Sequence, residues 1–186
     1  KILKTIKKNN YLKFWVVFVD DGSIDNGYLI INKFKKRYKH IFLLRNKKNF
    51  GQTYCYMKYL KNFRIKYFIR MDADNQDNPK YLLQMSKFIL EGYDLILTER
   101  KLRKHYLYMI ILTFCFNKLI ALLVKKKLKN YSSSMVCFKK KFISKGNLKH
   151  NDHRYLPIIA IDNGAKKIKI FPVIHEKRKF GFSKYR

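Results

Sequence analysis

Two aspartates separated by one residue, Asp72 and Asp74, follow a strand-like run at 66–70 and precede a helix-like run that opens at Pro79. In an extended chain, residues two apart point to the same side, so both carboxylates can face one site. Converging carboxylates repel each other unless a proton or a cation lies between them. Their oxygens suit Mg²⁺ or Mn²⁺, ions that commonly bridge a protein carboxylate to substrate phosphates. The same residues equally allow a polar loop in which an aspartate caps the next helix.

A second acidic strand end, formed by Asp20 and Asp21, directly follows the apolar run 14–19. Open α/β sheets bind ligands at the carboxyl ends of their strands, so a second acidic strand end strengthens the prediction of a site there. Further along, Asn49 is expected to cap a helix that begins near Gly51. This glycine is expected to allow a close approach of the backbone.

Strands and helices are predicted to alternate along the chain with short connections. Strand patterns cover 14–19, 41–45, 67–71, 94–97 and 166–173, and helix patterns cover 27–37, 51–60, 79–91 and 152–163. Such alternation predicts an α/β fold with a mostly parallel sheet and helices on both of its faces. The last strand alternates basic and apolar residues, as edge strands do. A length of 186 residues suits one domain.

The charge of the chain is strongly basic, with 43 Lys and Arg against 12 Asp and Glu and a formal net charge of +31. Such a charge predicts an anionic partner, which can be nucleic acid, anionic lipid or a phosphorylated substrate. Compositional drift toward lysine explains it equally well. No nucleic-acid-binding motif is present, and most aromatic residues occupy core-like positions. We therefore expect no nucleic acid among the partners, and a nucleic-acid-binding protein is only a distant alternative.

Residues 106–124 form the most apolar stretch, which is interrupted by Thr113, Asn117 and Lys118 and flanked by basic residues. The stretch could just span a bilayer, but Lys118 would then lie inside the span at a considerable energetic cost. We interpret it as a helix that lies partly in the core and partly at the membrane surface. A plain core helix and a true membrane span are the alternatives.

Four stretches of the chain, taken in order, resemble the signatures of the family 2 glycosyltransferases, which have a GT-A fold. They are Val19 to Asp25, Asn49 to Gln52, Met71 to Pro79 and Arg178 to Tyr185. The last of them resembles the closing signature of the branch that glycosylates polyprenyl phosphates, such as dolichyl-phosphate mannosyltransferase. The resemblance extends over nearly the whole chain, but the strand with which family members begin has no counterpart.

This resemblance implies a GT-A, Rossmann-like sheet without its first strand. Residues 1–186 would form a single catalytic domain, truncated at the N-terminus and before C-terminal membrane helices. The implied activity is inverting transfer of a sugar from a UDP- or GDP-sugar to a polyprenyl phosphate, either undecaprenyl or dolichyl, at the cytoplasmic face of the membrane. The alternatives are a saccharide acceptor in cell-surface polysaccharide synthesis and an inactive, truncated relative.

The resemblance also implies roles for individual residues. Asp74 would hold Mg²⁺ or Mn²⁺, with Asp72 close by, and Gln76 would be a further metal or phosphate contact. Arg100 matches a position near the acceptor phosphate, so the implied catalytic residues are Asp74, Asp72 and Arg100. The implied nucleotide-binding residues are Asp20, Asp21, Asp72, Arg178, Ser183 and Lys184.

The chain departs from the family where an acidic residue and an arginine are common, because Ser133 and Met135 stand there. Ser133 cannot act as a general base, and Asp152 is a weak alternative. A phosphate acceptor, whose second pKa is about 6, is already anionic at neutral pH and needs no base. The absence of an acidic residue at this position is therefore tolerable for transfer to a lipid phosphate and damaging for transfer to a sugar hydroxyl. His175 is expected to be a structural hydrogen-bonding residue rather than a catalyst.

Overall fold

The computed structural model describes residues 1–9, 12–60, 63–101, 111, 112, 115, 118, 135–143, 148, 149 and 151–176. Four residues with predicted roles, Ser133, Arg178, Ser183 and Lys184, lie outside the described residues. So does most of the apolar stretch 106–124, of which only Ile111, Leu112, Cys115 and Lys118 are described; these four are helical and exposed. Within the described part of the chain, no helix is long and apolar enough to cross a membrane.

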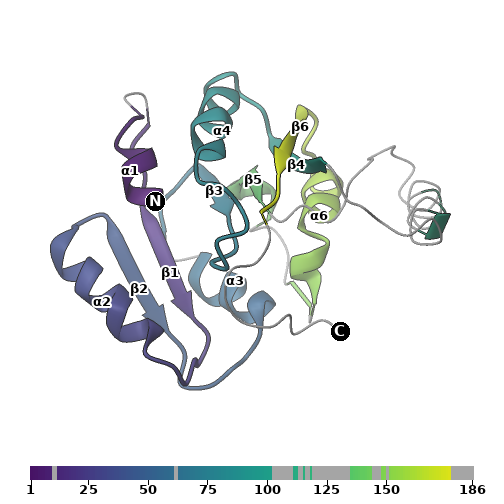
Figure 1. The fold of residues 1–186 in the computed structure, drawn as a ribbon. Coiled ribbons are helices and arrows are strands. Elements are labelled where there is room, and N and C mark those ends of the chain that lie inside the picture. The colour runs from purple at the N-terminus through teal and green to yellow at the C-terminus, as the bar shows by residue number, and fades with distance from the viewer. Residues whose placement is uncertain are drawn as a thin grey trace.

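The N-terminal part of the chain forms a two-stranded parallel sheet with a helix against it (Figure 1). Its elements are α1 (Ile2–Ile6), β1 (Val16–Asp20), α2 (Gly27–Arg37) and β2 (Ile41–Arg45). Val16 pairs with Ile41 at the start of the two strands, and Asp20 pairs with Arg45 at their ends. The acidic strand end is therefore aligned with the end of β2, as parallel pairing requires.

A second sheet has four strands in the order β3-β5-β4-β6. Its strands are β3 (Tyr67–Arg70), β4 (Leu95–Lys101), β5 (Val136–Lys139) and β6 (Ile168–Ile174). β4 and β6 are parallel, whereas β5 runs antiparallel to both β3 and β4. The α/β class is confirmed, and the antiparallel β5 makes this sheet mixed. β6 lies at the edge, as its alternating basic and apolar residues predict.

The helices after β2 cover the second sheet on both faces. They are α3 (Gln52–Leu60), α4 (Tyr81–Leu90), the 3₁₀ turns Lys140–Phe142 and Asp152–Arg154, and α6 (Leu156–Asp162). The helix predicted over 152–163 is thus divided, because Tyr155 leaves helical geometry with φ −109° and ψ 11°. Pro157 then stands in the first turn of α6, where its missing N–H has no partner to lose.

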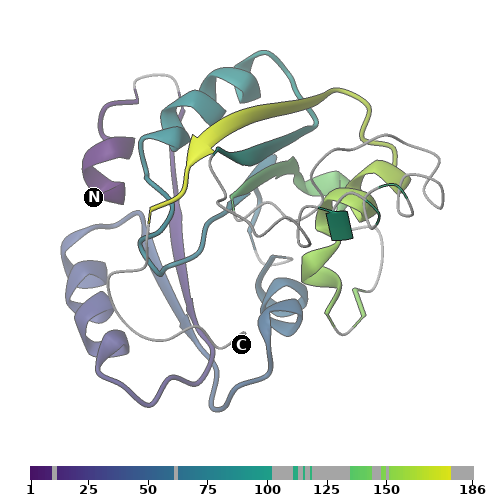
Figure 2. The ribbon, with the colours of Figure 1, turned by 45° about the vertical axis from the view of Figure 1, so that its right-hand side comes forward.

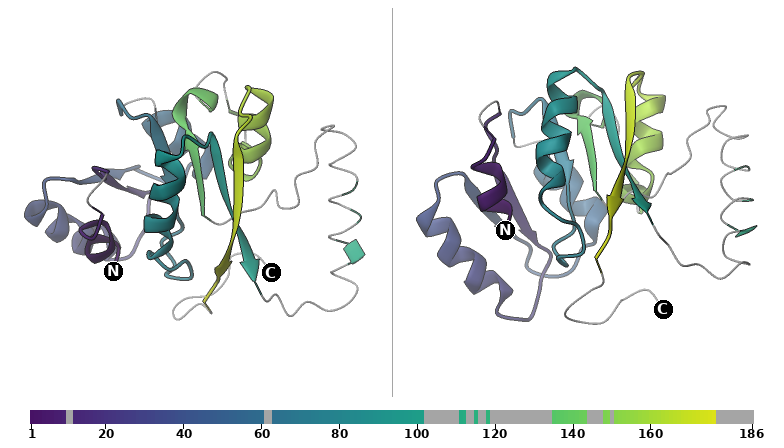
Figure 3. Two further views of the ribbon diagram at one scale, coloured as in Figure 1. Left: turned by 90° about the horizontal axis from the view of Figure 1, so that it is seen from above. Right: turned by 45° about the horizontal axis from the view of Figure 1, so that its top comes forward.

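Neighbouring residues of β4 show that the sheet is buried on both faces. Leu95 and Leu97 belong to a cluster with α6, Ile96 belongs to a cluster with α4, and none of the three exposes any surface. Alternate residues of a strand point to opposite faces, so each cluster covers one face. Figure 3 shows α4 and α6 on opposite sides of the sheet. The prediction of helices on both faces is confirmed.

The two sheets share one of these clusters but are not paired. Val16 of β1 packs in the same cluster as Tyr67 and Ile69 of β3. Within the described residues, however, β1 pairs with β2 and β3 pairs with β5, and no strand joins β1 to β3.

Candidate active site

The first acidic strand end is held by an internal network around Asp20. Its buried carboxylate accepts a hydrogen bond from the Ser23 amide at 2.9 Å and forms an ion pair with Arg45 Nε at 3.1 Å. The Arg45 guanidinium lies 4.4 Å from the centre of the Tyr28 ring, in a cation–π arrangement. Asp20 therefore fixes the loop after β1 and connects it to the end of β2.

Asp21 connects this loop to the turn before α3. Its carboxylate accepts hydrogen bonds from Asn46 Nδ2 at 2.8 Å, the Phe50 amide at 3.0 Å and the Gly51 amide at 2.7 Å. Burial raises the pKa of the Asp21 carboxyl, but these three donors and the Cys55 thiol together lower the pKa by more, so the net shift is downward. Asp21 is thus a carboxylate at neutral pH, and it holds the Asn-x-Gly turn against the acidic loop.

The two motifs approach so closely that only glycine fits between them. Gly22 has φ +74°, and a Cβ added there would lie 2.4 Å from the Lys48 carbonyl carbon and 2.7 Å from the Asn49 nitrogen. Gly51 has φ +88°, but a Cβ there would meet nothing within 4 Å. The expectation of a close backbone approach at Gly51 is therefore wrong. The close approach occurs at Gly22 instead, whereas Gly51 allows the positive φ that the turn requires.

Asn46, which the sequence analysis did not single out, is at the centre of this network. It is 2% exposed and follows β2 directly. Its Nδ2 donates to Asp21, and its Oδ1 accepts from the Tyr59 hydroxyl at 2.6 Å and from Lys58 Nζ at 3.2 Å. Its place in the sequence, as a polar residue immediately after a buried strand, is the signal by which it could have been found. Asn46 thus orients Asp21 from the side of α3.

The second acidic stretch forms a loop rather than an extension of the strand. β3 ends at Arg70, so Asp72 and Asp74 both lie in the loop after it. Asp74 Oδ1 accepts a hydrogen bond from the Gln76 amide at 3.1 Å, and Asn75 adopts a left-handed conformation with φ 63°. Asparagine tolerates this region better than most residues. The loop brings the carboxylates together by turning the chain, not by strand alternation.

Electrostatics shows that the carboxylates of this loop are close neighbours. Burial raises the pKa of Asp72, as do the charges of Asp77 and Asp74, whereas Arg70 and Arg100 lower it; the net pKa shift is upward. Arg100, on β4, is one of the charges that lower the pKa of Asp72. Arg70, which the sequence analysis did not select, has the larger effect and donates through Nη1 to the His153 carbonyl oxygen at 3.1 Å.

The donor set fits a divalent cation that also binds phosphate. The carboxylates of Asp72 and Asp74 and the side-chain carbonyl of Gln76 offer oxygen ligands, which Mg²⁺ and Mn²⁺ prefer. Within the described ranges, no group of three His, Cys, Asp or Glu side chains is arranged to hold a metal ion by itself. Mg²⁺ usually takes one or two carboxylates and completes its shell with water and substrate phosphates. A cation here would also offset the burial and the repulsion that together raise the pKa of Asp72.

The end of β6 is attached to this loop (Figure 2). Gln76 and Glu176 exchange two bonds: the Glu176 amide donates to the Gln76 carbonyl oxygen at 2.9 Å, and Gln76 Nε2 donates to the Glu176 carbonyl oxygen at 3.1 Å. His175 Nδ1 lies 3.0 Å from Asp77 Oδ1, and Asn78 Nδ2 donates to Glu176 Oε1 at 3.4 Å. His175 is thus a hydrogen-bonding residue, as expected.

Sequence comparison assigns the family. A family model described as "Glycosyl transferase family 2" matches residues 1–146. The chain belongs to glycosyltransferase family 2. It is 28% identical over 171 residues to the undecaprenyl-phosphate 4-deoxy-4-formamido-L-arabinose transferases of two Pectobacterium species, P. carotovorum and P. atrosepticum. The alignment with each covers 91% of this chain and 52% of the relative, so the chain spans about half the length of these curated relatives.

Solved glycosyltransferases share the fold. A mannosyltransferase from Pyrobaculum calidifontis, in complex with GDP-Man and Mn²⁺, superposes with a TM-score of 0.63 at 13% identity, over 95% of this chain and 51% of that one. Glucosyl-3-phosphoglycerate synthase from Mycobacterium tuberculosis, in complex with Mn²⁺ and UDP, gives a TM-score of 0.66 at 13% identity, over 95% and 66%. The GT-A fold of this family 2 glycosyltransferase is thereby confirmed.

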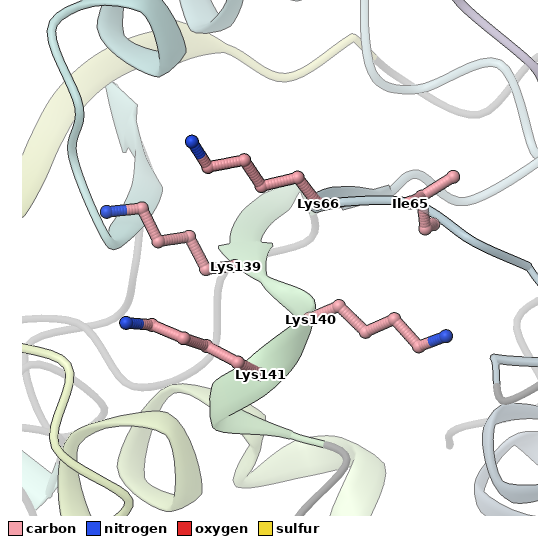
Figure 4. Close-up of a pocket in the computed structure, with 5 residues that line it drawn as sticks. All are labelled: Ile65, Lys66, Lys139, Lys140 and Lys141. Atoms are coloured by element: carbon pink, nitrogen blue, oxygen red, sulfur yellow. The ribbon is translucent and has the colours of Figure 1, made fainter.

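A lysine-lined pocket of about 500 Å³ lies at the other end of β3, next to Ile65 (Figure 4). Lys66, Lys139 and Lys141 extend to one side of it, and Lys140 extends to the other. Lys139 Nζ pairs with Asp94, and Lys140 Nζ donates to the Phe63 carbonyl oxygen. Because this pocket precedes Tyr67, whereas the loop of Asp72 and Asp74 comes after Arg70, it is separate from the acidic site.

Proposed function

We propose that this family 2 glycosyltransferase moves a sugar from a UDP- or GDP-sugar to a polyprenyl phosphate at the membrane surface, with inversion at the anomeric carbon. The observation that carries the proposal is the loop after β3, where Asp72 lies within electrostatic reach of Asp74, Asp77, Arg70 and Arg100. Such a mixture of carboxylates and guanidinium groups suits a divalent cation and phosphate together. The naming of the Pectobacterium relatives as undecaprenyl-phosphate transferases supports the acceptor.

Asp74, Asp72 and Gln76 would hold Mg²⁺ or Mn²⁺ at the donor diphosphate. A divalent ion bound there supplies Lewis-acid stabilisation of the departing nucleoside diphosphate. Gln76 uses its amide nitrogen on the Glu176 carbonyl oxygen, which leaves the amide oxygen as its metal-binding atom. Complexes of Mn²⁺ with two GT-A proteins that share the fold support a divalent ion of this kind.

Asp20 and Asp21 would form the nucleotide-recognition loop. Asp20 matches the family position that hydrogen-bonds the base or the ribose, and its pairing with Arg45 holds its carboxylate at the end of β1. Asp21 would act less directly, since its carboxylate holds the turn at Phe50 and Gly51. The loop would therefore be shaped before the nucleotide arrives, which reduces the entropic cost of binding.

Arg178, Ser183 and Lys184 would close over the diphosphate. The position of Glu176 supports this proposal, because Glu176 is bonded to the metal loop and precedes Arg178 by two residues in the sequence. Cationic side chains at this place would stabilise the negative charge that develops on the leaving phosphates.

Arg100 would bind the acceptor phosphate next to Asp72. An anionic phosphate oxygen can attack the anomeric carbon without a general base, whereas a sugar hydroxyl requires one. Asp152, the weak alternative base, accepts a hydrogen bond from the Lys149 amide. That bond supports a structural role for Asp152 in the turn before α6. A phosphate acceptor therefore agrees better with these residues than a saccharide.

The deciding experiment is calorimetric titration of UDP and of GDP, with and without Mn²⁺. The wild-type chain is expected to bind one nucleotide in a metal-dependent way, Asp74→Ala is expected to lose that binding, and the exposed control Asp162→Ala is expected to keep it. Absence of metal-dependent binding by a folded wild-type chain would favour an inactive relative. For the acceptor, transfer by the full-length protein to a saccharide, with none to polyprenyl phosphate, would disprove the lipid-phosphate assignment.

A further inference from the structure

Helix α2 is unusual in burying no residue, although it carries large apolar side chains. Leu29 is 56% exposed, Ile30 is 57% exposed and Phe34 is 44% exposed. By contrast, α4 buries five residues, which are Tyr81, Leu82, Met85, Ser86 and Ile89. Apolar surface left in water costs roughly 25 cal/mol per Å². Apart from the Phe34 ring, which stacks on Tyr38 at 6.5 Å, the outward face of α2 is therefore an apolar surface that the described part of the chain leaves largely exposed.

Basic side chains are interleaved with these apolar ones. Lys33, Lys36 and Arg37 are all exposed on the same helix. Residues four apart lie one above the other on a helix, so Leu29, Lys33 and Arg37 form one row, and Ile30 and Phe34 form the adjacent row. No acidic residue occurs in α2. The outward face thus combines an apolar row with a basic row.

The inward face holds α2 in place, so the outward face is free to bind elsewhere. Tyr28 lies beneath the Arg45 guanidinium, and Ile31 is partly buried. Figures 1 and 3 show α2 at the outer edge of the molecule, on the far side of the β1–β2 sheet from the four-stranded sheet. The Asp20–Asp21 loop leads directly into α2, and Ile24 in that connection is fully exposed.

We propose that the outward face of α2, formed by Leu29, Ile30, Lys33, Phe34 and Arg37, docks on an anionic lipid bilayer. A bilayer interface accommodates both rows at once, because the apolar side chains enter the acyl boundary while the basic groups stay with the lipid phosphates. A protein partner would have to remove Lys33 and Arg37 from water, at a cost of several kcal/mol unless both were paired. The proposal rests on the proposed function, since a lipid-phosphate acceptor requires an enzyme at the membrane.

The test is flotation of the purified chain with vesicles of phosphatidylcholine alone and of phosphatidylcholine with phosphatidylglycerol, both without polyprenyl phosphate. Omitting the acceptor separates docking on the bilayer from acceptor binding at the active site. Two α2 variants are compared: Lys33→Gln with Arg37→Gln, and Leu29→Gln with Ile30→Gln and Phe34→Gln. The matched control is Lys87→Gln with Leu90→Gln, because these exposed residues of α4 have the same character on another surface.

The expected result is binding to the anionic vesicles that falls with rising salt. Neutralising two basic residues should weaken binding about thirtyfold, at about 1 kcal/mol per basic residue. The apolar variant should weaken it at least tenfold, and the α4 control should bind like the wild type. Equal binding by all three variants would overturn the proposal. A dimer seen by sedimentation, lost in the apolar variant while vesicle binding persists, would overturn it in favour of a protein interface.

Nucleotide titration of the same variants separates this proposal from the proposed function. All α2 variants should bind nucleotide and metal as the wild type does, because none of their substituted side chains contacts the acidic loops through a described hydrogen bond. Flotation that depends on α2, in a chain without metal-dependent nucleotide binding, would support the docking surface while disproving the activity. Circular dichroism of each variant confirms that loss of flotation is not loss of folding.

Discussion

His175 and Asp77 face each other across 98 residues of sequence, with His175 Nδ1 3.0 Å from Asp77 Oδ1. Asp77 is 2% exposed and belongs to the loop that carries Asp72 and Asp74. The bonds between Gln76 and Glu176 flank this pair, so three consecutive residues of the loop, 76–78, are attached to the end of β6. The position of the loop that carries Asp72 and Asp74 thus depends on a segment from the other end of the chain.

Replacing His175 with alanine should weaken metal binding without abolishing nucleotide binding. Loss of a residue that orients metal ligands typically costs about 10- to 100-fold in metal affinity. His175→Asn should recover part of that loss, because its amide nitrogen can take the place of Nδ1. Mn²⁺ titration in the presence of nucleotide measures the effect, and Ile174→Ala, an exposed neighbour, is the control. Unchanged Mn²⁺ affinity in folded His175→Ala would show that the contact does not position the loop.

Substitution of Gly22 should be far more damaging than substitution of Gly51. Both glycines have positive φ, which costs another residue about 1–2 kcal/mol. At Gly22 a Cβ would also collide with the Lys48 backbone at 2.4 Å, whereas at Gly51 it would meet open space. Urea unfolding should therefore show a loss of about 1 kcal/mol for Gly51→Ala and a clearly larger loss for Gly22→Ala. Equal losses would contradict the close approach of the two motifs.

Removing the Asn46 side chain should destabilise the protein and disturb the nucleotide loop. Asn46→Ala removes one of the three donors to Asp21 and leaves the buried Tyr59 hydroxyl without this partner, a loss that costs about 1–3 kcal/mol. Tyr59→Phe removes only the 2.6 Å hydrogen bond and should cost about 1 kcal/mol. Chemical unfolding measures both values. A smaller effect for Asn46→Ala than for Tyr59→Phe would rule out the central position of Asn46.

Asp94 should make the stability of the protein depend on acidity. Burial raises the pKa of its carboxyl, but bonds from Lys139 and from the Lys167 and Lys166 amides lower it more, to about 2. A pKa below the ordinary 3.8 means that the folded state binds this proton less readily than the unfolded state. The resulting stability is present above about pH 5 and is lost as the pH falls toward 2.

Urea unfolding from pH 6 down to pH 2.5 tests this pH dependence. Asp94→Asn should be less stable than the wild type at pH 6. The difference should shrink toward pH 2.5, because the Asp94 carboxyl of the unfolded wild-type chain takes up its proton before that of the folded chain. Asp162→Asn, which alters an exposed carboxyl, is the control. A constant difference between Asp94→Asn and wild type would contradict the lowered pKa.

The elements and their chemical character could be predicted from the sequence alone. The helix over 27–37 and the strand over 41–45 have the bounds that their patterns predict. The acidic pairs Asp20–Asp21 and Asp72–Asp74 both occur at strand ends, as predicted. Hydrophobic periodicity and turn residues act over a few neighbours, so local sequence suffices to determine an element and the turn at its end.

The partners of the polar groups were decided only by tertiary structure. Asp21 is hydrogen-bonded to the Gly51 amide, 30 residues away in the sequence. Arg70 is hydrogen-bonded to the His153 carbonyl, 83 residues away, and Gln76 to the Glu176 carbonyl, 100 residues away. The antiparallel direction of β5 is equally non-local, because strand pairing depends on how distant segments pack rather than on local pattern. Local pattern therefore suffices to place the acidic residues at or just after the ends of β1 and β3. Packing decided which side chains meet there, since a buried polar group is held by whichever donor or acceptor the closed fold brings to it.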